Sequence, residues 1–390
     1  MAWHSNSSSG WREPTDLPIR ASRGLALAVG RLAKAPGLWL IAAALALLPG
    51  CATAPATKPA AKYIFYPPAP ETPRLQFLVS YSDEKDLGRQ VSKFANFITG
   101  EEVQSQPILK PYGVALANNQ LCVCDTGART VDLLDLSQKT MRRLAPTGMG
   151  MLGVPVNLAV DTDGTRYVAD TGRGQVMIYG ADDSFKGALG GEKPLQPSGV
   201  AVAADRVFVT DLKGHCVRVY NKTNRELLFT VPRDPDAEED KEPGKLYMPV
   251  GLALDAQGRM YVSDTASCRI QIFDGEGRHL RTLGTRGDLP GQFARPKGVA
   301  VDREGRIYVV DAAAQVCQIF DPEGKLLLFF GEPGGSDAPL NLPAAICIDY
   351  AHVGLFQPYA APDFVVEHLI LISNQLGDRK VSVYGLGHKK

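Results

Sequence analysis

Five aspartates recur along the sequence, each directly after a short apolar run and before a polar turn. They are Asp125, Asp170, Asp211, Asp264 and Asp311. Carboxylate oxygens that converge on one site could bind calcium, whereas a carboxylate at the end of a strand can accept the backbone N–H groups of the next turn. Because the aspartates keep one position after the apolar run, we predict that they cap turns.

The histidines do not recur in this way. His215, His279, His352, His368 and His388 occupy different positions relative to the apolar runs, so they are not expected to converge on a metal ion. The sequence shows neither a nucleophile placed with a histidine and an acid, nor a Gly-rich phosphate-binding loop. We therefore expect no metal, no cofactor and no catalytic residue, and we do not expect an enzyme.

Six of the seven cysteines lie inside apolar runs and form no C-x-x-C pair, at positions 122, 124, 216, 268, 317 and 347. Small buried side chains are the expected role. A disulfide is the alternative, because an oxidising compartment would allow one.

Basic side chains follow the apolar runs in several places. If these turns share one face, the side chains form a basic collar that could bind an acidic partner or an anionic ligand. Scattered surface charge is the alternative. The candidates in these turns are Arg129, Arg173, Lys213, His215 and Arg379, and Lys297, in a loop that enters an inner strand, is expected on the same face.

The elements that position these residues come from an internal repeat. Its unit is Pro, an alternating apolar run, a polar turn and a second apolar run that ends in Asp. The openings are 44, 42, 52, 47 and 47 residues apart, at Pro111, Pro155, Pro197, Pro249, Pro296 and, in a degraded copy, Pro343. This period is typical of four-stranded blades. We predict an all-β, six-bladed β-propeller over residues 74–387.

Each unit predicts particular strands. In the fifth unit, Gly298–Asp302 is the innermost strand and Ile307–Asp311 the second. The glycine lets backbones approach one another near the axis. The sixth unit lacks an outer strand, and Pro73–Glu84 is a strand without a blade. We expect this N-terminal strand to complete blade six and close the ring, which removes two open sheet edges.

The repeated pattern resembles the NHL-repeat family of six-bladed propellers. The likeness is carried by Gly251–Asp255, Tyr261–Thr265 and Arg269–Phe273 in blade four, and by the two strands of blade five given above. The Asn-His-Arg stretch of that family is replaced by Ser-Cys-Arg in blade four and Ala-Gln-Val in blade five. The segment before the propeller also resembles that of bacterial NHL-repeat lipoproteins found with envelope multihaem cytochromes.

Residues 1–50 differ from the rest of the chain. Gly37–Leu48 is an apolar run that is too short to span a bilayer and has the length of a signal-peptide core. The Leu-Pro-Gly-Cys that ends at Cys51 resembles the lipobox of bacterial lipoproteins. We expect a leader whose translation start lies too far upstream, a lipid on Cys51 and a Pro-rich tether over residues 51–73. An ordinary secretory signal or a short membrane anchor is the alternative.

Three segments do not fit the repeat. Residues 232–244 are expected to form a solvated loop, and residues 86–102 a short helix that packs on the propeller or docks a partner. Residues 351–367 interrupt blade six with aromatic side chains that suit a protein contact, unless the insertion folds back on the blade. The aromatic candidates are Tyr350, Phe356, Tyr359 and Phe364.

These observations favour a non-catalytic scaffold that is lipid-anchored in the cell envelope, at the outer membrane. The resemblance implies an envelope protein as partner, such as a multihaem cytochrome in an electron-transfer complex. A formal net charge of zero argues against nucleic acid. The alternatives are an enzyme of the lyase or lactonase type, since such enzymes share the scaffold, or a binder of a small anionic ligand or glycan at the basic collar.

Overall fold

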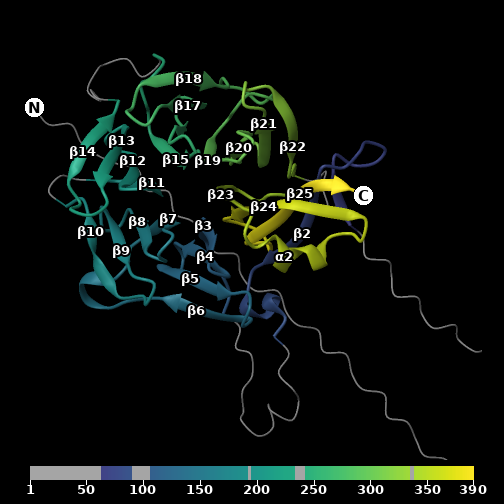
Figure 1. Cartoon of the computed structure of the whole chain (residues 1–390), viewed down its shortest axis with the longest axis horizontal. Helices are drawn as coiled ribbons and strands as arrows, with labels where there is room; N and C mark the ends of the chain where they lie inside the picture. The colour runs from purple at the N-terminus through teal and green to yellow at the C-terminus, as the bar shows by residue number, and fades with distance from the viewer. Residues whose placement is uncertain (1–62, 90–105, 192–194, 233–241, 334–337) are drawn as a thin grey trace, which may run out of the picture. The chain divides into compact units, whose positions relative to one another are not determined.

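The computed structural model describes residues 63–89, 106–191, 195–232, 242–333 and 338–390 (Figure 1). All described residues belong to one compact unit within residues 61–390. The leader, Cys51, the tether up to residue 62, residues 90–102 and most of the 232–244 loop lie outside the described residues. None of the described helices has the length and apolar character needed to cross a membrane.

Six antiparallel sheets surround a central axis, which confirms the predicted all-β, six-bladed β-propeller (Figure 1). In blades one to five, the four strands run from the axis outwards in sequence order. Blade one contains β3 (Pro111–Ala117), β4 (Gln120–Asp125), β5 (Thr130–Asp135) and β6 (Thr140–Leu144). Blade two contains β7 (Pro155–Val160), β8 (Arg166–Asp170), β9 (Gln175–Tyr179) and β10 (Phe185–Leu189).

Blades three to five repeat this arrangement. Blade three contains β11 (Pro197–Ala203), β12 (Arg206–Asp211), β13 (Cys216–Asn221) and β14 (Leu227–Val231). Blade four contains β15 (Pro249–Leu254), β16 (Met260–Asp264), β17 (Arg269–Phe273) and β18 (His279–Leu283). Blade five contains β19 (Pro296–Val301), β20 (Ile307–Asp311), β21 (Val316–Phe320) and β22 (Leu326–Phe330).

Blade six joins the two ends of the propeller. Its strands from the axis outwards are β23 (Pro343–Asp349), β24 (Phe364–Asn374), β25 (Val381–Lys389), β2 (Leu75–Tyr81) and β1 (Ile64–Tyr66). The N-terminal β2 pairs with β25, from Leu75 opposite Leu386 to Tyr81 opposite Val381, so the ring closes as predicted. The extra strand β1 lies within the segment expected to be tether. The ring of Phe65 lies 5.5 Å from that of Phe364, which explains why β1 packs on the blade.

The apolar core lies between the blades. Six clusters of buried side chains each join two neighbouring sheets. Between blades five and six, for example, Tyr308 and Phe330 pack with Ile370 and Tyr384, all 1% exposed or less. No blade can bury both faces alone, so the stability of each sheet depends on its neighbours.

The six inner strands contact one another around the axis: β3 packs on β7 and β23, β11 on β7 and β15, and β19 on β15 and β23. Glycine at the third position of an inner strand permits this approach. A Cβ on Gly251 would lie 2.0 Å from the carbonyl oxygen of Lys297, and one on Gly199 would lie 2.6 Å from that of Val250. The expected reason for these glycines is therefore confirmed.

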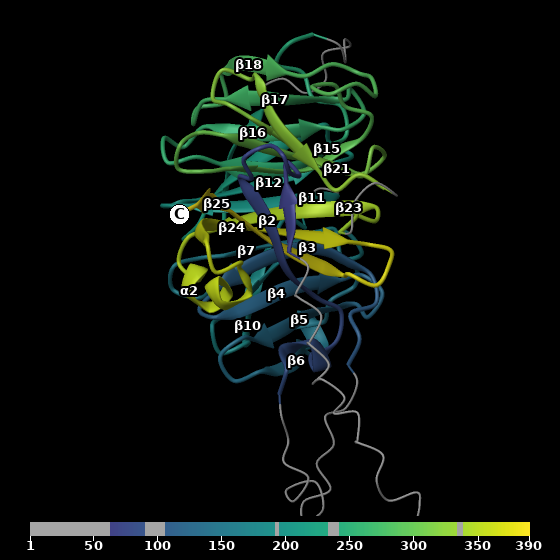
Figure 2. The same ribbon diagram turned by 90° about the vertical axis from the view of Figure 1, so that its right-hand side faces the viewer.

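Antiparallel pairing divides the connections between two faces. We call the face where the inner strands begin, which also carries the turns between second and third strands, the top face. The opposite, bottom face carries the turns between first and second strands. In blade six that turn is enlarged by α2 (Val353–Phe356) and a 3-10 turn, η3 (Gln357–Tyr359). Figure 2 shows α2 close to β24.

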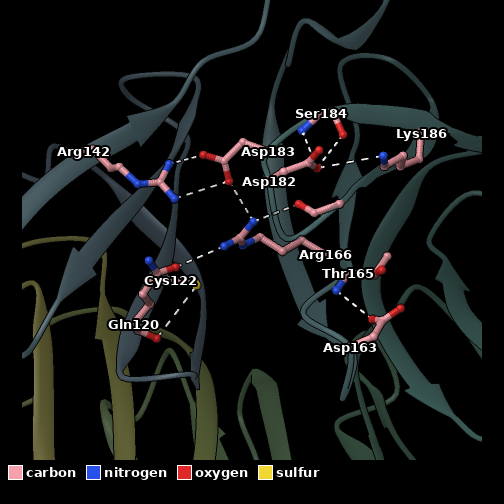
Figure 3. Close-up of polar contacts among 11 residues, drawn as sticks. Gln120, Cys122, Arg142, Asp163, Thr165, Arg166, Asp182, Asp183, Ser184 and Lys186 are labelled. Atoms are coloured by element: carbon pink, nitrogen blue, oxygen red, sulfur yellow. Dashed lines mark hydrogen bonds and ion pairs between the residues drawn. The ribbon is translucent and has the colours of Figure 1, made fainter.

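Polar contacts add to the packing between blades one and two (Figure 3). The guanidinium of Arg166, on β8, is nearly buried and donates to the side chain of Gln120 at 3.0 Å and to Asp183 at 2.8 Å. Asp183 also pairs with Arg142 of blade one. These contacts occur on the bottom face and join two blades, which indicates a structural role.

Gly251→Ala should lower the free energy of unfolding by about 1–3 kcal/mol, because its methyl group would press on the backbone of the next blade. The control is Gly354→Ala, since no atom lies within 4 Å of a Cβ at that position in α2. Urea unfolding followed by fluorescence measures both variants. Equal stability of the two would contradict the proposed close approach at the axis.

Candidate functional site

All five repeated aspartates accept a backbone N–H from the segment before an inner strand, and four of them also accept one from the turn after the second strand. Asp311 accepts the backbone N–H groups of Ala294 and Arg295, which precede β19, at 2.7 and 3.0 Å. The same carboxylate accepts those of Ala313 and Ala314, in the turn after β20, both at 3.0 Å. Asp125 binds four backbone N–H groups in the same way, at 2.6–3.1 Å.

The other blades vary this arrangement. Asp170 accepts three backbone N–H groups. Asp211 and Asp264 accept fewer, and each pairs instead with an arginine of the third strand, Arg218 at 2.6 Å and Arg269 at 2.7 Å. Burial raises the pKa of Asp264. All five carboxylates are 0% exposed, and no group of three potential metal ligands occurs among the described residues.

In blades one to five, one residue of each turn between second and third strands has a left-handed backbone conformation. Its φ is +58° at Arg129, +51° at His215, +55° at Cys268 and +57° at Gln315, and Gly174 is its equivalent in blade two. Non-glycine residues seldom adopt this conformation. The turn is therefore shaped by the buried carboxylate and the backbone, because the side chains at this position differ in type.

The predicted basic residues differ in their surroundings. Arg129, Arg173 and Lys213 are exposed. His215 stacks on Tyr247 at 4.9 Å, and its Nδ1 accepts the N–H of Met248 at 3.1 Å. Arg379 lies over the ring of Phe77 on the outer part of blade six, 5.0 Å from its centre. Of the basic candidates, Lys297 alone lines the cavity at the axis.

The axial cavity has a volume of about 300 Å³ and is lined by the inner strands of all six blades. Most of the lining is apolar or glycine. Four side chains with strong polar groups line it, namely Tyr112, Asn157, Ser198 and Lys297. The hydroxyl of Ser198 is already used, because it donates to the carbonyl of Pro249 at 2.8 Å. No carboxylate is part of the lining.

Lys297 is a buried cation without a carboxylate partner. The residue is 6% exposed, and its amine lies 4.8 Å from the centre of the Tyr112 ring. No ion pair joins it to any carboxylate in the part of the chain that the structure describes. Burial, reinforced by the positive charges of Arg295 and Lys110, lowers the pKa of Lys297 to about 8. Uncompensated desolvation is the physical cause.

The position of Lys297 follows from the repeat. The second residues of the six inner strands are Tyr112, Val156, Ser198, Val250, Lys297 and Ala344. Blade six lies between Lys297 and Tyr112, and its small Ala344 leaves room for the lysine to reach the tyrosine ring. Tyr112 is held by blade six, since the hydroxyl of Ser373 donates to its carbonyl. Burial also raises the pKa of the Tyr112 phenol.

Hydroxyl groups keep the inner strands in register around this cavity. Thr210 donates to the carbonyl of Val250 at 3.1 Å, and Thr265 to that of Pro296 at 2.7 Å. Each bond crosses from one blade to the next. These bonds fix the cavity wall on the blade-four side of Lys297.

The insertion in blade six packs back on the propeller. Phe356 and Phe364 are each 1% exposed, so the prediction that their rings are free for a partner is wrong. The buried Gln76 of β2 holds this loop by accepting the N–H of Ala361 at 3.0 Å and donating to the carbonyl of Tyr359. Tyr359 itself remains 44% exposed.

Tyr350 belongs to a second polar cluster, at the bottom of blades five and six. Its ring lies under the guanidinium of Arg303 at 4.1 Å. Beside it, the hydroxyl of Tyr308 donates its hydrogen to Asp302 at 2.8 Å. The hydroxyl has no second hydrogen, so its oxygen accepts the Nε2–H of His368 at 3.1 Å. Burial lowers the pKa of His368. His368 is 1% exposed, so its imidazole is closed to a substrate.

A larger hollow, of about 670 Å³, lies at the rim between β1 and β22. It is lined by residues 63–69 and 326–332 with Glu71, and the lining is mostly apolar. Its only charged side chains are those of Glu71 and Glu332. The axial cavity is smaller, but it is lined by Lys297, whose pKa burial lowers to about 8, and perturbed groups in cavities are candidates for functional sites. We therefore take the axial cavity as the candidate site.

Comparison with known proteins supports the fold. Residues 246–326 match the model of a family described as DUF5128, 6-bladed beta-propeller. No curated protein matches the sequence. A gluconolactonase from Xanthomonas campestris is 18% identical, with a TM-score of 0.53, over 85% of this chain and 99% of that one.

Two further structures are similar. A streptogramin B lyase is 15% identical, with a TM-score of 0.50, over 73% of this chain and 85% of that one. A protein of unknown function from Bacteroides thetaiotaomicron is 17% identical, with a TM-score of 0.53, over 73% of this chain and 71% of that one. At these identities the likeness concerns the fold.

One expectation from the sequence is corrected by these comparisons. We did not expect an enzyme, because no catalytic constellation was found. The structures that share this fold include a lyase and a gluconolactonase, so this expectation is corrected: the fold of this chain is one that enzymes also have. The repeat shows only what the blades have in common, whereas a site depends on residues such as Lys297 that occur once.

Asp311→Asn should lower the free energy of unfolding by about 1–3 kcal/mol, because an amide group would face backbone N–H donors. Asp321→Asn is the control, since that carboxylate accepts the N–H of Lys325 in an exposed turn. Thermal unfolding followed by circular dichroism measures the melting temperatures of both variants. A melting temperature that falls equally in both would show that the buried carboxylate has no special role.

Proposed function

We propose that this propeller is an enzyme-type scaffold that binds a small anionic substrate in its axial cavity. The ammonium group of Lys297 holds the anionic group of the substrate. The observation that carries the proposal is Lys297, which is 6% exposed and lines the cavity without a carboxylate partner among the described residues. A buried charge of this kind is costly until an opposite charge joins it.

The lining suggests how such a substrate would lie. Lys297 is at the top end of its strand, near the charges of Arg295 and Lys110, so the anionic group belongs there. Towards the bottom the inner strands present Leu254, Val301 and Ile348. A cavity of this size and polarity favours a small molecule with one anionic end and an apolar remainder.

Lys297→Met should remove anion binding and stabilise the free protein. Because the pKa of Lys297 is lowered from 10.5 to about 8, protonation is disfavoured in the folded state. The full destabilisation is present below pH 8 and disappears as pH rises towards 10.5. We expect the variant to gain about 1–3 kcal/mol at pH 7, and no gain above pH 10.5.

Calorimetric titration with small carboxylates and phosphates measures the binding, with Lys213→Met as the control because Lys213 is an exposed lysine of the top face. The wild type and the control should bind at least one of these anions, more weakly as pH rises through 8. Binding that survives in Lys297→Met, or no binding at all, would contradict the proposal.

The sequence also supports a place in the cell envelope, at the outer membrane. The apolar run and Cys51 indicate a lipid anchor, and multiple acyl chains on one cysteine would hold the propeller firmly at a membrane. An envelope partner such as a multihaem cytochrome stays a prediction. Arg129, Arg173, Lys213 and Tyr359 are its exposed candidate contacts.

Cys51→Ala should move the protein from the membrane fraction to the soluble fraction and abolish incorporation of labelled palmitate. Cys347→Ala is the control, because that cysteine lies in blade six, on the inner strand β23. Fractionation and labelling in a bacterial host measure both. Membrane retention and labelling of the Cys51 variant would refute the lipid anchor.

A further inference from the structure

We infer that the amine of Lys297 forms a reversible imine with its substrate, and that the substrate class is a small 2-oxo acid. This inference rests on the proposed function, because the carboxylate of such an acid is the anionic group that the cavity binds. It adds a covalent step and names the carbonyl group with which the amine reacts.

The geometry isolates the amine from groups that would keep it protonated. Lys297 is 6% exposed, and no ion pair is formed by its amine within the described ranges of the chain. The aromatic ring of Tyr112 lies beneath the amine at 4.8 Å, and the cavity wall contains no carboxylate. An amine that lacks an acidic partner and faces a cavity is accessible to an electrophile.

Two positive charges near Lys297 affect both the amine and the substrate. Arg295 and Lys110, together with burial, make protonation of Lys297 less favourable. With a pKa of about 8, about a tenth of the amine is unprotonated at pH 7, whereas an ordinary exposed lysine is almost fully protonated. Desolvation and neighbouring cations are a known means of making a lysine nucleophilic. The same cations attract a carboxylate, so they bring the substrate to the activated amine.

The step needs no oxidant and no cofactor. The nitrogen lone pair attacks the carbonyl carbon, a C–N bond forms, and the oxygen takes a proton to give a carbinolamine. The C–O bond then breaks and the oxygen leaves as water. Both hydrogens of the neutral amine end in that water, and a C=N bond remains. The phenol of Tyr112, which burial keeps protonated, can donate a hydrogen bond to the departing oxygen.

The size of the cavity limits the substrate. About 300 Å³ is at the lower end of small-molecule sites, so a short 2-oxo acid fits better than a long one. Asn157 and Ser198 are the other strongly polar side chains of the lining besides Tyr112 and Lys297. The anionic end and the carbonyl group therefore belong near Lys297, with the remainder of the molecule against apolar strands.

The test is reductive trapping of the intact protein. The protein is incubated with pyruvate and sodium cyanoborohydride, and intact-mass and peptide-mass spectrometry follow the product. We expect one adduct per chain, located at Lys297, formed at least tenfold faster than any adduct at Lys213 and faster as pH rises from 7 to 8. Adducts spread equally over the exposed lysines, or none at Lys297, would overturn the inference.

Two probes separate this inference from the proposed function. Lactate has the carboxylate of pyruvate but no carbonyl group, so it should bind in a Lys297-dependent manner without being trapped. If lactate binds in this manner and pyruvate leaves no adduct, the imine is excluded and anion binding stands. If neither acid binds, both proposals fail. Acetone has the carbonyl group without the carboxylate, and trapping as fast as with pyruvate would contradict the role of the anionic group.

Lys297→Arg tests the residue itself, because arginine keeps the positive charge but cannot form the imine. We expect lactate binding within about tenfold of the wild type and no adduct with pyruvate. Circular dichroism and thermal unfolding establish that the variant is folded. An adduct of unchanged yield in this folded variant would show that another residue reacts.

Discussion

The close packing of six inner strands around the axis is the constraint on which the rest of the structure depends. The backbone of each inner strand lies against the next, so glycine is needed where the approach is tightest, as at Gly251. Buried aspartates then fix the segment before each strand, as Asp311 fixes Ala294 and Arg295. Apolar clusters between the blades supply the stability. Few polar side chains fit at the axis, and this makes Lys297 unusual.

Regular and irregular features differ in how well the sequence predicts them. The period of the proline openings predicts six blades, and the unassigned N-terminal strand predicts the closure of the ring, because both follow from local patterns. Local patterns do not determine the isolation of Lys297, which depends on Tyr112 in another blade and on the small Ala344 between them. The insertion that contains Phe356 is likewise held by Gln76, which lies far away in the sequence.

Stability and function make opposite demands at the axis. The interblade clusters and the hydroxyl bonds of Thr210 and Thr265 hold the inner strands rigidly. Within that rigid wall the structure keeps one charge without a counter-charge, and active sites commonly store destabilisation of this kind. Other buried polar groups are used in fixed contacts, as His368 is with Tyr308. The axial lysine lines a cavity instead, and this makes it the candidate group for contact with a substrate.

The measurement that tests this account most directly is a pH titration of Lys297 by NMR with ¹³C-labelled lysine. The Lys297→Arg variant assigns the signal, because that signal is missing from its spectrum. The account predicts a midpoint near pH 8 in the free protein. It also predicts a higher midpoint when saturating propionate supplies the missing negative charge. A midpoint near the ordinary 10.5, unchanged by propionate, would contradict the central claim.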